Sequence, residues 1–360
     1  MRVLFDIGHP AHVHLFKNTI FNLKKHGHDV KITARKKKVS HALLTAYDLD
    51  FEDRGKVYTG LLNKAFGMVR IDLDLFSIAQ KFKPDLLVGV NNPYVAHVGA
   101  VLRKPVIIFN DTENVPIARV ITYPFVQVIL TPMYFREYVD PKKHIKIQGM
   151  KEIAYLHPNW FSPNPHVLEE LGILPHEKFI IISFGSFVAT HDIGQQGIRD
   201  KIRFVKTLET YGRVLITSDV DLPKELKPNL IKISPEKFHD ILSYAALYVG
   251  EGITMASEAA VLGTPAINVT STASGKPTCE MYGNFVELRE KYDLVHFFAT
   301  EEDALIDALE ILKNPNSNSE WQKKRERFLA DVVDFTAWLT DFIENYPESF
   351  INYKKINRVS

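Results

Sequence analysis

The sequence has a single cysteine, almost no net charge and no long uninterrupted apolar run. Cys279 alone cannot form an intramolecular disulfide, which favours a reducing, cytoplasmic location. The 44 Lys and Arg residues nearly balance the 43 Asp and Glu residues, so no whole-molecule field attracts nucleic acid. No window approaches the roughly 18 consecutive apolar residues that a membrane-spanning helix needs. These absences leave an ordinary globular chain whose contact with a membrane is at most peripheral.

The length and the first residues set the scale of the protein. A chain of 360 residues is long enough for two domains of about 150 residues each. It passes directly from Met1 into the strand-like residues 2–8, without the basic stretch and apolar run of a secretory signal. We therefore expect no signal peptide and a cytoplasmic protein.

Short β-branched runs alternate with helical segments in both halves of the chain, which is typical of βαβ units around a buried parallel sheet. The first half predicts strands over residues 2–8, 29–33, 85–90, 105–111 and 126–132. The second half predicts strands over residues 179–185, 213–218, 229–234, 247–250, 265–269 and 295–299. The expected fold is therefore α/β, with two Rossmann-like domains.

Prolines at positions 158, 163 and 165 interrupt both helix and sheet, so residues 149–165 predict an interdomain linker. The N-terminal domain then covers residues 1–155 and the C-terminal domain covers residues 166–318. From Ser319 to Tyr346, apolar residues recur every three or four positions, which predicts a long amphipathic helix. We expect this C-terminal segment, residues 319–360, to pack back across both domains.

The most informative segment covers residues 245–269, which predict a strand, a turn with Gly250 and Gly252, and a helix from Ile253. At the carboxyl ends of parallel strands, loops lead into helix N-termini, whose free amides suit a diphosphate. Glu258 lies one to two turns inside that helix, where its carboxylate can accept hydrogen bonds from vicinal sugar hydroxyls. Taken alone, the same pattern also fits a tight turn followed by a solvated glutamate.

Residues 252–266, GITMASEAAVLGTPA, resemble the nucleotide-binding signature of GT-B glycosyltransferases, above all the enzyme that adds N-acetylglucosamine to the lipid-linked peptidoglycan precursor. The resemblance implies a GT-B fold, in which two Rossmann-like domains turn their parallel sheets toward a central cleft. It also implies that Glu258 holds the ribose hydroxyls of a UDP-sugar. Gly252, Ile253 and Thr254, at the start of the helix, then face the diphosphate.

Other segments match this family in the same order along the chain. Residues 7–13 stand where the family has a glycine-rich loop that ends in a histidine, so His12 is implied as a candidate base near the acceptor and the diphosphate. Ile7, His9, Pro10 and Ala11 replace most of the glycines of that loop, which makes a close approach of its backbone to a phosphate less assured.

Two segments of the second half extend the match. Phe184-Gly185-Ser186 resembles the turn that opens the second domain, where the amides of Gly185 and Ser186 would face the phosphates. Residues 280–284 resemble a stretch that binds sugar hydroxyls, here through Glu280 and Asn284. Glu280 stands where the family prefers glutamine, and a carboxylate only accepts hydrogen bonds, so this departure bears on the identity of the donor sugar. The whole chain also resembles an uncharacterised prokaryotic group of this fold, DUF354.

A second resemblance, to UDP-N-acetylglucosamine 2-epimerases of the same fold, rests on Asn110-Asp111-Thr112-Glu113 after a predicted strand. Asp111 or Glu113 could deprotonate an acceptor hydroxyl for transfer, or take a proton from C2 of the sugar for epimerisation. The same residues also suit a turn or a helix cap before Pro116. His191 corresponds by position to a functional histidine of the epimerases, although its neighbours lack their arginine-rich context and also fit an ordinary loop.

Three histidines within six residues, His9, His12 and His14, raise the question of a zinc site. They follow one another through a proline-containing turn onto different faces of a helix, and no cysteine or obvious fourth ligand accompanies them. We therefore expect no catalytic metal and no cofactor. Helix dipoles and amides would stabilise the departing diphosphate instead.

The acceptor side of the site rests on weaker patterns. Asn91-Asn92-Pro93-Tyr94 follows a predicted strand, where its amide side chains suit sugar hydroxyls as well as ordinary turn chemistry. Basic residues 35–38 and the apolar residues of segment 61–70 suit either a peripheral contact with the inner face of a membrane or a solvated surface. Nucleic acid is not an expected partner, because the basic residues lack interleaved stacking aromatics.

The sequence therefore predicts a glycosyltransferase that moves a sugar from a nucleotide-activated donor, with a UDP-sugar expected, to a glycan or lipid-linked acceptor. Two alternatives stay open, a nucleotide-sugar epimerase and a non-catalytic protein that binds a nucleotide-sugar.

Overall fold

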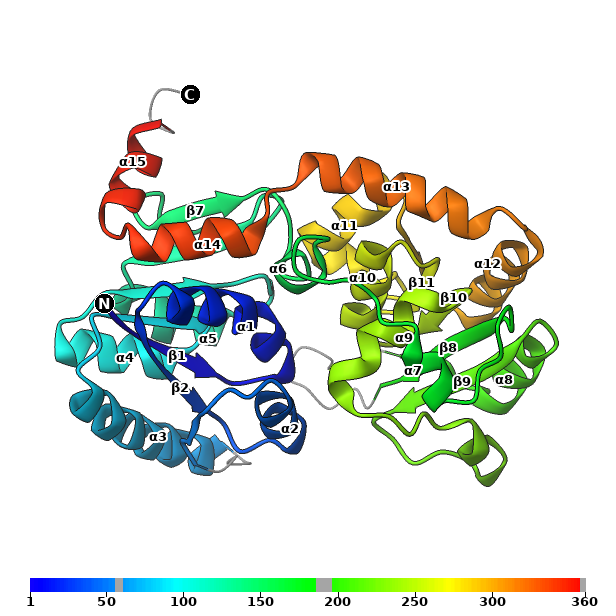
Figure 1. Ribbon diagram of the computed structural model, residues 1–360, viewed down its shortest axis with the longest axis horizontal. Helices are drawn as coiled ribbons and strands as arrows, with labels where there is room; N and C mark the ends of the chain where they lie inside the picture. The colour runs from blue at the N-terminus through cyan, green and yellow to red at the C-terminus, as the bar shows by residue number, and fades with distance from the viewer. Residues whose placement is uncertain (56–60, 186–195, 357–360) are drawn as a thin grey trace. The chain divides into compact units, whose positions relative to one another are not determined.

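The computed structural model describes residues 1–55, 61–185 and 196–356, which form two compact α/β units (Figure 1). The first unit comprises Met1–Tyr155 and Val333–Ser360, and the second comprises Leu156–Val332. Each unit is built on one sheet of parallel strands, as the alternating pattern of the sequence predicts.

The first unit has a seven-stranded sheet in the order β3-β2-β1-β4-β5-β6-β7. Its central strands consist mainly of apolar residues, because helices cover both faces of a parallel sheet and leave no face to solvent. Strand β1, for example, buries its last five residues completely or nearly so. The strands are β1 (Arg2–Ile7), β2 (Asp29–Ala34), β3 (Glu52–Asp53), β4 (Leu86–Val90), β5 (Val106–Phe109), β6 (Val128–Pro132) and β7 (His144–Ile147).

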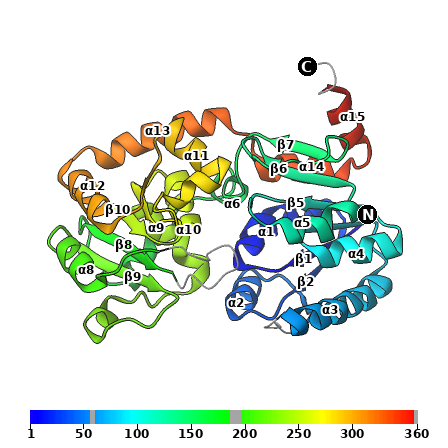
Figure 2. The same cartoon turned by 180° about the vertical axis from the view of Figure 1, so that it is seen from behind.

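Helices lie on both faces of this sheet. On one face α1 packs against α2 and α14, and on the other α3 runs beside α4, which also contacts α5 (Figures 1 and 2). The helices of this unit are α1 (Pro10–Lys25), α2 (Lys38–Ala46), α3 (Leu61–Phe82), α4 (Pro93–Leu102), α5 (Pro116–Thr122), α14 (Phe335–Glu344) and α15 (Glu348–Ile356). The short helix α6 (Ile153–Leu156) lies at the boundary between the units.

The amphipathic pattern from Ser319 to Tyr346 forms two helices, so the prediction of one long helix is wrong. Helix α13 (Ser317–Asp331) belongs to the second unit, whereas α14 belongs to the first. The chain becomes extended at Val332, and the Asp334 carboxylate then caps a new helix by accepting a hydrogen bond from the amide of Ala337 at 3.0 Å. Apolar spacing cannot reveal this break, because it continues across it.

The second unit has a five-stranded sheet in the order β12-β11-β10-β8-β9. Helices α9, α10 and α11 cover one face, and α8 and α12 cover the other. The strands are β8 (Phe179–Phe184), β9 (Arg213–Ser218), β10 (Leu247–Gly250), β11 (Ala266–Val269) and β12 (Val295–Phe298). The helices are α7 (His166–Glu170), α8 (Lys201–Glu209), α9 (Phe238–Tyr244), α10 (Ile253–Leu262), α11 (Gly283–Glu290) and α12 (Glu301–Lys313), followed by α13.

Residues 229–234 do not form the strand that their apolar alternation predicts. They make a single bridge to the edge strand β9, between Leu230 and Ile216. Pro228 and Pro235 lie on either side of the segment and cannot donate to a ladder, so the pairing does not extend. Conversely, the sequence pattern did not predict β3 and β7, because both strands are short and carry charged residues.

Close packing of α4 on β5 makes Gly99 a sensitive position. A Cβ atom at Gly99 would lie 2.2 Å from Cγ2 of Val106, so even alanine would force the helix away from the strand. We expect Gly99→Ala to lower the free energy of unfolding by about 1–3 kcal/mol in urea titrations. Val101→Ala, on the exposed face of the same helix, should change it by less than about 0.5 kcal/mol. Equal effects of the two substitutions would contradict this packing.

Candidate functional site

A buried carboxylate, Asp6, joins the carboxyl ends of four neighbouring strands in the first unit. Its Oδ1 accepts hydrogen bonds from Thr33 Oγ1 of β2 at 2.6 Å and from Nε of Arg54, just after β3, at 2.5 Å. Its Oδ2 accepts from Nδ2 of Asn92, which follows β4 and caps α4. Each of the four side chains is at least nine-tenths buried. The loops at this edge are therefore fixed by charge as well as by packing.

Arg54 extends this cluster toward the first loop. Its guanidinium lies over the ring of Tyr94, 4.7 Å from the ring centroid, and its Nη1 has no hydrogen-bond partner among the described residues. A Cβ atom at Gly8 would lie 3.8 Å from Nη2 of Arg54 and 3.7 Å from Cε1 of His12. Both side chains therefore border the space beside the α-carbon of Gly8.

Asp111 and Lys151 form a second buried pair at the same edge. Asp111 follows β5, and its Oδ2 accepts a hydrogen bond from Nζ of Lys151 at 2.6 Å. Nζ of Lys151 also lies 3.1 Å from Oε1 of Glu152. Burial opposes the charged form of Asp111, but the Lys151 cation outweighs it, so the pKa of the Asp111 carboxyl is lowered. The two carboxylates in turn raise the pKa of Lys151, although burial opposes this.

His12 is the third residue of α1 and is partly buried. Its Nδ1 accepts a hydrogen bond from the backbone amide of Gly8 at 3.3 Å. Burial, assisted by the neighbouring His9, lowers the pKa of His12 to about 3. An imidazole with so low a pKa is a weak base at neutral pH.

The structure separates Glu113 from Asp111. Glu113 is buried, and its Oε1 accepts a hydrogen bond from the amide of Arg136, in the segment after β6, at 3.3 Å. Asn110 accepts from the amide of Thr112 at 3.1 Å, which forms the turn that the sequence also allowed. Of the two acidic residues predicted here, only Asp111 contacts Lys151 among the described ion pairs.

In the second unit, three polar groups close a ring around the turn between β10 and α10. The amide of Gly252 donates to Ser183 Oγ at 3.2 Å, and Tyr248 Oη donates to the carbonyl of Gly252 at 2.9 Å. Ser183 Oγ therefore donates to Tyr248 Oη, 2.6 Å away, which completes the cycle. The amide of Gly252, a predicted phosphate ligand, therefore already donates its hydrogen bond within the protein, to Ser183. Ile253 and Thr254 begin α10, which no side chain caps.

Glu251 lies beside this ring and binds both ends of the segment that precedes α8. Its two carboxylate oxygens accept from the amides of Gly185 at 2.7 Å and Ile198 at 2.6 Å. Burial raises the pKa of the Glu251 carboxyl, and Lys201 at 3.8 Å and the two amides offset this only in part. A Cβ atom at Gly197 would lie 2.2 Å from Oε1, so the carboxylate occupies the space that a side chain would need.

The predicted phosphate ligand Gly185 thus donates its amide to Glu251. Ser186 and His191, which were predicted to bind phosphate and to act in proton transfer, lie outside the described residues.

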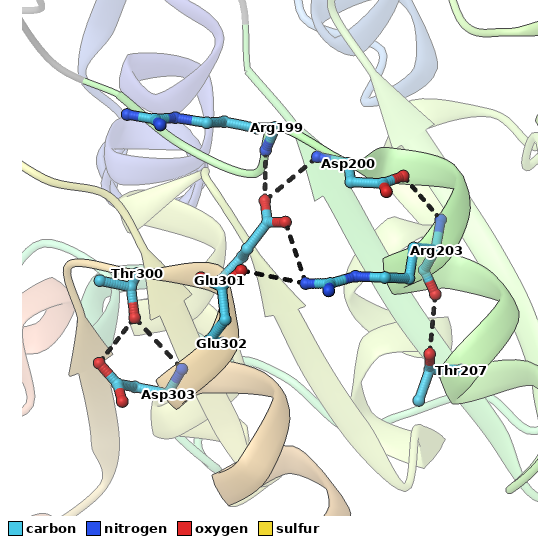
Figure 3. A network of polar contacts seen from close by, with 8 residues as sticks. All are labelled: Arg199, Asp200, Arg203, Thr207, Thr300, Glu301, Glu302 and Asp303. Atoms are coloured by element: carbon cyan, nitrogen blue, oxygen red, sulfur yellow. Dashed lines mark hydrogen bonds and ion pairs between the residues drawn. The ribbon is translucent and has the colours of Figure 1, made fainter.

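A second carboxylate, Glu301 at the start of α12, binds the next residues of the same segment (Figure 3). Its Oε2 accepts from the amides of Arg199 at 2.5 Å and Asp200 at 3.2 Å, and Oε1 lies 3.4 Å from Nη2 of Arg203. The backbone amides of residues 198–200 therefore all donate to buried glutamates, the first to Glu251 and the other two to Glu301. The start of α8 is fixed before any ligand arrives.

Glu258 lies in the second turn of α10 and is 6% exposed, so it is not the solvated helix residue that the sequence also allowed. Its Oε1 lies 3.1 Å from Nε2 of His239, a buried residue of α9. The ring of His239 in turn makes edge contacts with Phe161 and Phe238. The Glu258 carboxylate is thus held in one place by a partner that the sequence did not reveal.

The two residues after β11 that were predicted to bind sugar hydroxyls differ in burial. Glu280 is partly exposed, and its Oε2 lies 3.5 Å from Nζ of Lys276. Asn284, the second residue of α11, is 3% exposed, and neither atom of its amide group has a hydrogen-bond partner among the described residues. An unsatisfied buried amide costs about 1–3 kcal/mol, which a hydroxylated ligand could recover.

Within the described ranges, no cluster of three or more His, Cys, Asp and Glu side chains could hold a metal ion. The helices of the same ranges include none that is both long and apolar enough to cross a membrane.

Removing the Lys151 cation tests the charge balance at the first edge. We expect Lys151→Met to lower the free energy of unfolding by about 3 kcal/mol at pH 7, because two buried carboxylates lose their counter-ion. The depressed pKa of Asp111 stabilises the native chain above its usual range, and this contribution is lost as the pH falls. The difference from the unaltered protein should therefore shrink between pH 7 and pH 3, mainly below about pH 4. Urea titrations at both pH values measure it, with exposed Lys142→Met as the control.

Solved structures with a similar arrangement of strands and helices include UDP-N-acetylglucosamine 2-epimerases and glycosyltransferases. A UDP-N-acetylglucosamine 2-epimerase from Neisseria meningitidis, solved with UDP-N-acetylglucosamine, is 13% identical, has a TM-score of 0.64 and aligns over 98% of this chain and 100% of its own. The epimerase from Methanocaldococcus jannaschii is 15% identical, with a TM-score of 0.63 over 91% and 99%. A spinosyn rhamnosyltransferase is 15% identical, with a TM-score of 0.61 over 96% and 100%. These likenesses confirm the α/β GT-B fold.

Comparison with curated proteins by sequence gives no match. A family model described as "Protein of unknown function (DUF354)" matches residues 1–277. This range runs from β1 to the segment after β11, and so includes Asp6, Asp111 and Glu258 but not Asn284 or Glu301. Because it covers well over half of the 360 residues, the chain belongs to the DUF354 family.

Proposed function

We propose that this protein is a glycosyltransferase that uses a nucleotide-activated sugar, with a UDP-sugar as the expected donor. The observation that carries the proposal is the turn into α10, where an uncapped helix N-terminus lies one turn from a buried, oriented carboxylate, Glu258. The fold shared with nucleotide-sugar enzymes supports it. No cofactor or metal is part of the proposal.

The second unit would bind the nucleotide. The first amides of α10, at Ile253 and Thr254, have no intrahelical acceptor and carry the positive end of the helix dipole, which suits a diphosphate. Glu258 would accept hydrogen bonds from the two ribose hydroxyls, while His239 keeps its carboxylate in place. Asn284, with its unsatisfied amide, and Glu280 would bind hydroxyls of the sugar.

The first unit would activate the acceptor, with Asp111 as the base. Its lowered pKa keeps Asp111 ionised at neutral pH, and Lys151 fixes its orientation. In transfer, Asp111 takes the proton of the acceptor hydroxyl, the acceptor oxygen bonds to the anomeric carbon, and the bond to the diphosphate breaks. His12 and Glu113 are weaker candidates for the base. The pKa of His12 is about 3, and Glu113 accepts a hydrogen bond from the backbone of Arg136.

An epimerase is the second candidate, because two of the similar structures are UDP-N-acetylglucosamine 2-epimerases. The same carboxylates would then move a proton at C2 of the sugar instead of at an acceptor hydroxyl. A protein that binds a nucleotide-sugar without turnover would need only the groups of the second unit.

We propose a glycan or lipid-linked acceptor, handled by a cytoplasmic protein at the inner face of the membrane. Large apolar side chains are well exposed on two helices of the first unit that contact α4, at Phe66, Val69 and Leu73 of α3 and at Ile117 and Val120 of α5. Monomeric proteins rarely expose contiguous apolar surface without a partner. A lipid-linked acceptor offers such a partner in its acyl chains and in the bilayer around it.

Substitution of Glu258 tests nucleotide binding at a single residue. We expect Glu258→Gln to weaken the binding of UDP by about 1–3 kcal/mol in calorimetric titrations, because an amide in place of the carboxylate loses charge-assisted hydrogen bonds to the ribose. Glu326→Gln, on the exposed face of α13, is the matched control and should bind UDP as the unaltered protein does. Unchanged affinity in a folded Glu258→Gln protein would show that the ribose lies elsewhere.

The reaction itself is tested with UDP-N-acetylglucosamine in deuterated water, followed by NMR of the sugar. We expect UDP to be released only when a glycan or lipid-linked acceptor is added, and faster when that acceptor is presented in anionic phospholipid vesicles. Deuterium incorporated at C2 would instead establish the epimerase. Tight binding without turnover under either condition would favour the binding protein, and absence of nucleotide binding would contradict all three.

A further inference from the structure

The contact between Gly8 and His12 determines which ring nitrogen of His12 carries its proton. A backbone N–H can only donate a hydrogen bond, and the amide of Gly8 donates to Nδ1 of His12 at 3.3 Å. Nδ1 therefore acts as the acceptor and holds no proton. In the neutral imidazole the single proton then lies on Nε2, which is a donor and has no lone pair in the ring plane to accept another.

The surroundings of His12 keep the ring neutral. It is the third residue of the 16-residue helix α1, where the N-terminal end of the helix dipole disfavours a cation. The charged or titratable groups that act on the ring are His9, Lys151 and Arg54, which disfavour protonation, and Asp111, which favours it. Asp111 is already paired with Lys151 at 2.6 Å. Burial is the largest effect and, with these charges, lowers the pKa of His12 to about 3, so the ring holds no charge at neutral pH.

We propose that His12 serves as a neutral hydrogen-bond donor to the substrate through Nε2–H, rather than as a base. The assignment of His12 as a donor rests on the position of Gly8. Its amide already donates to Nδ1, the only ring nitrogen that could accept a proton. This follows the principle by which a histidine at a helix N-terminus polarises an oxygen while remaining uncharged.

The chemistry of the partner follows from the local charge. The end of α1, Arg54 and Lys151 favour an anionic oxygen near Nε2–H. If the proposed function holds, that oxygen belongs to the diphosphate of the nucleotide-sugar, whose negative charge grows as the sugar leaves. A donor aimed at this growing charge stabilises the transition state more than the ground state. Proton removal from the acceptor is left to Asp111.

The tautomer can be measured without any substrate. In long-range proton–nitrogen NMR spectra of histidine-labelled protein, the His12 signals are identified by their loss in His12→Gln. We expect a protonated Nε2, a bare Nδ1, and no titration between pH 5 and pH 8. The control is His9→Asn, which removes the neighbouring ring 6.0 Å away and should preserve the pattern. Titration in that range, or a proton on Nδ1, would overturn the proposal.

The donor role is tested by two variants that place an amide differently. Glutamine can present its amide where Nε2–H lies, whereas the shorter asparagine reaches only the position of Nδ1. Binding of UDP-N-acetylglucosamine to His12→Gln should stay within about threefold of the unaltered protein, and binding to His12→Asn should weaken about tenfold. Equal affinities of the two folded variants would contradict a donor role.

Failure of the proposed function gives a different result. In that case the unaltered protein itself would not bind UDP-N-acetylglucosamine, whatever residue stands at position 12. The NMR measurement would still decide between a neutral donor and a titrating base, because it needs no ligand.

Discussion

At the strand ends of both units, a carboxylate removed from water must find its cations or hydrogen-bond donors within the chain itself. The positions of the loops at both edges depend on this constraint. Asp6 and Asp111 in the first unit and Glu251 in the second lie at or near the ends of parallel strands, where little or none of each side chain is exposed. An ionised group in such a place is stable only with opposite charge or several donors around it. Each carboxylate therefore binds loops from other strands and fixes their positions before a substrate arrives.

The two units meet this constraint in different ways, and the difference matches the proposed division of work. In the first unit the partners are cations, Arg54 and Lys151, so the edge holds compensated charges that tune the protonation of Asp111 and His12. In the second unit Glu251 is bound mainly by backbone amides, and the ring through Ser183 shapes the start of α10. In the proposed function, proton transfer to Asp111 takes place in the first unit, and the amides at the start of α10 in the second unit bind the diphosphate.

The sequence predicted elements well where one local pattern decides them. Apolar runs such as β1 and β8 and the glycine turn before α10 were predicted close to their observed bounds. The long C-terminal helix was wrong because a single cap at Asp334 breaks it, and residues 229–234 were wrong because prolines limit their pairing. In the candidate site, Asp111 and Glu258, whose roles stay predictions, were predicted from their positions after strands and from family resemblance. Their partners Lys151 and His239 were not, because no local pattern links residues so far apart along the chain.

The proposed function depends above all on the binding of a nucleotide-sugar at the turn into α10 in the second unit. Hydrogen–deuterium exchange with and without UDP-N-acetylglucosamine tests it most directly, because the first amides of an uncapped helix exchange readily unless a ligand accepts from them. We expect slower amide exchange in peptides that cover residues 250–258 when the nucleotide-sugar is bound. Binding that leaves exchange of residues 250–258 unchanged would contradict it.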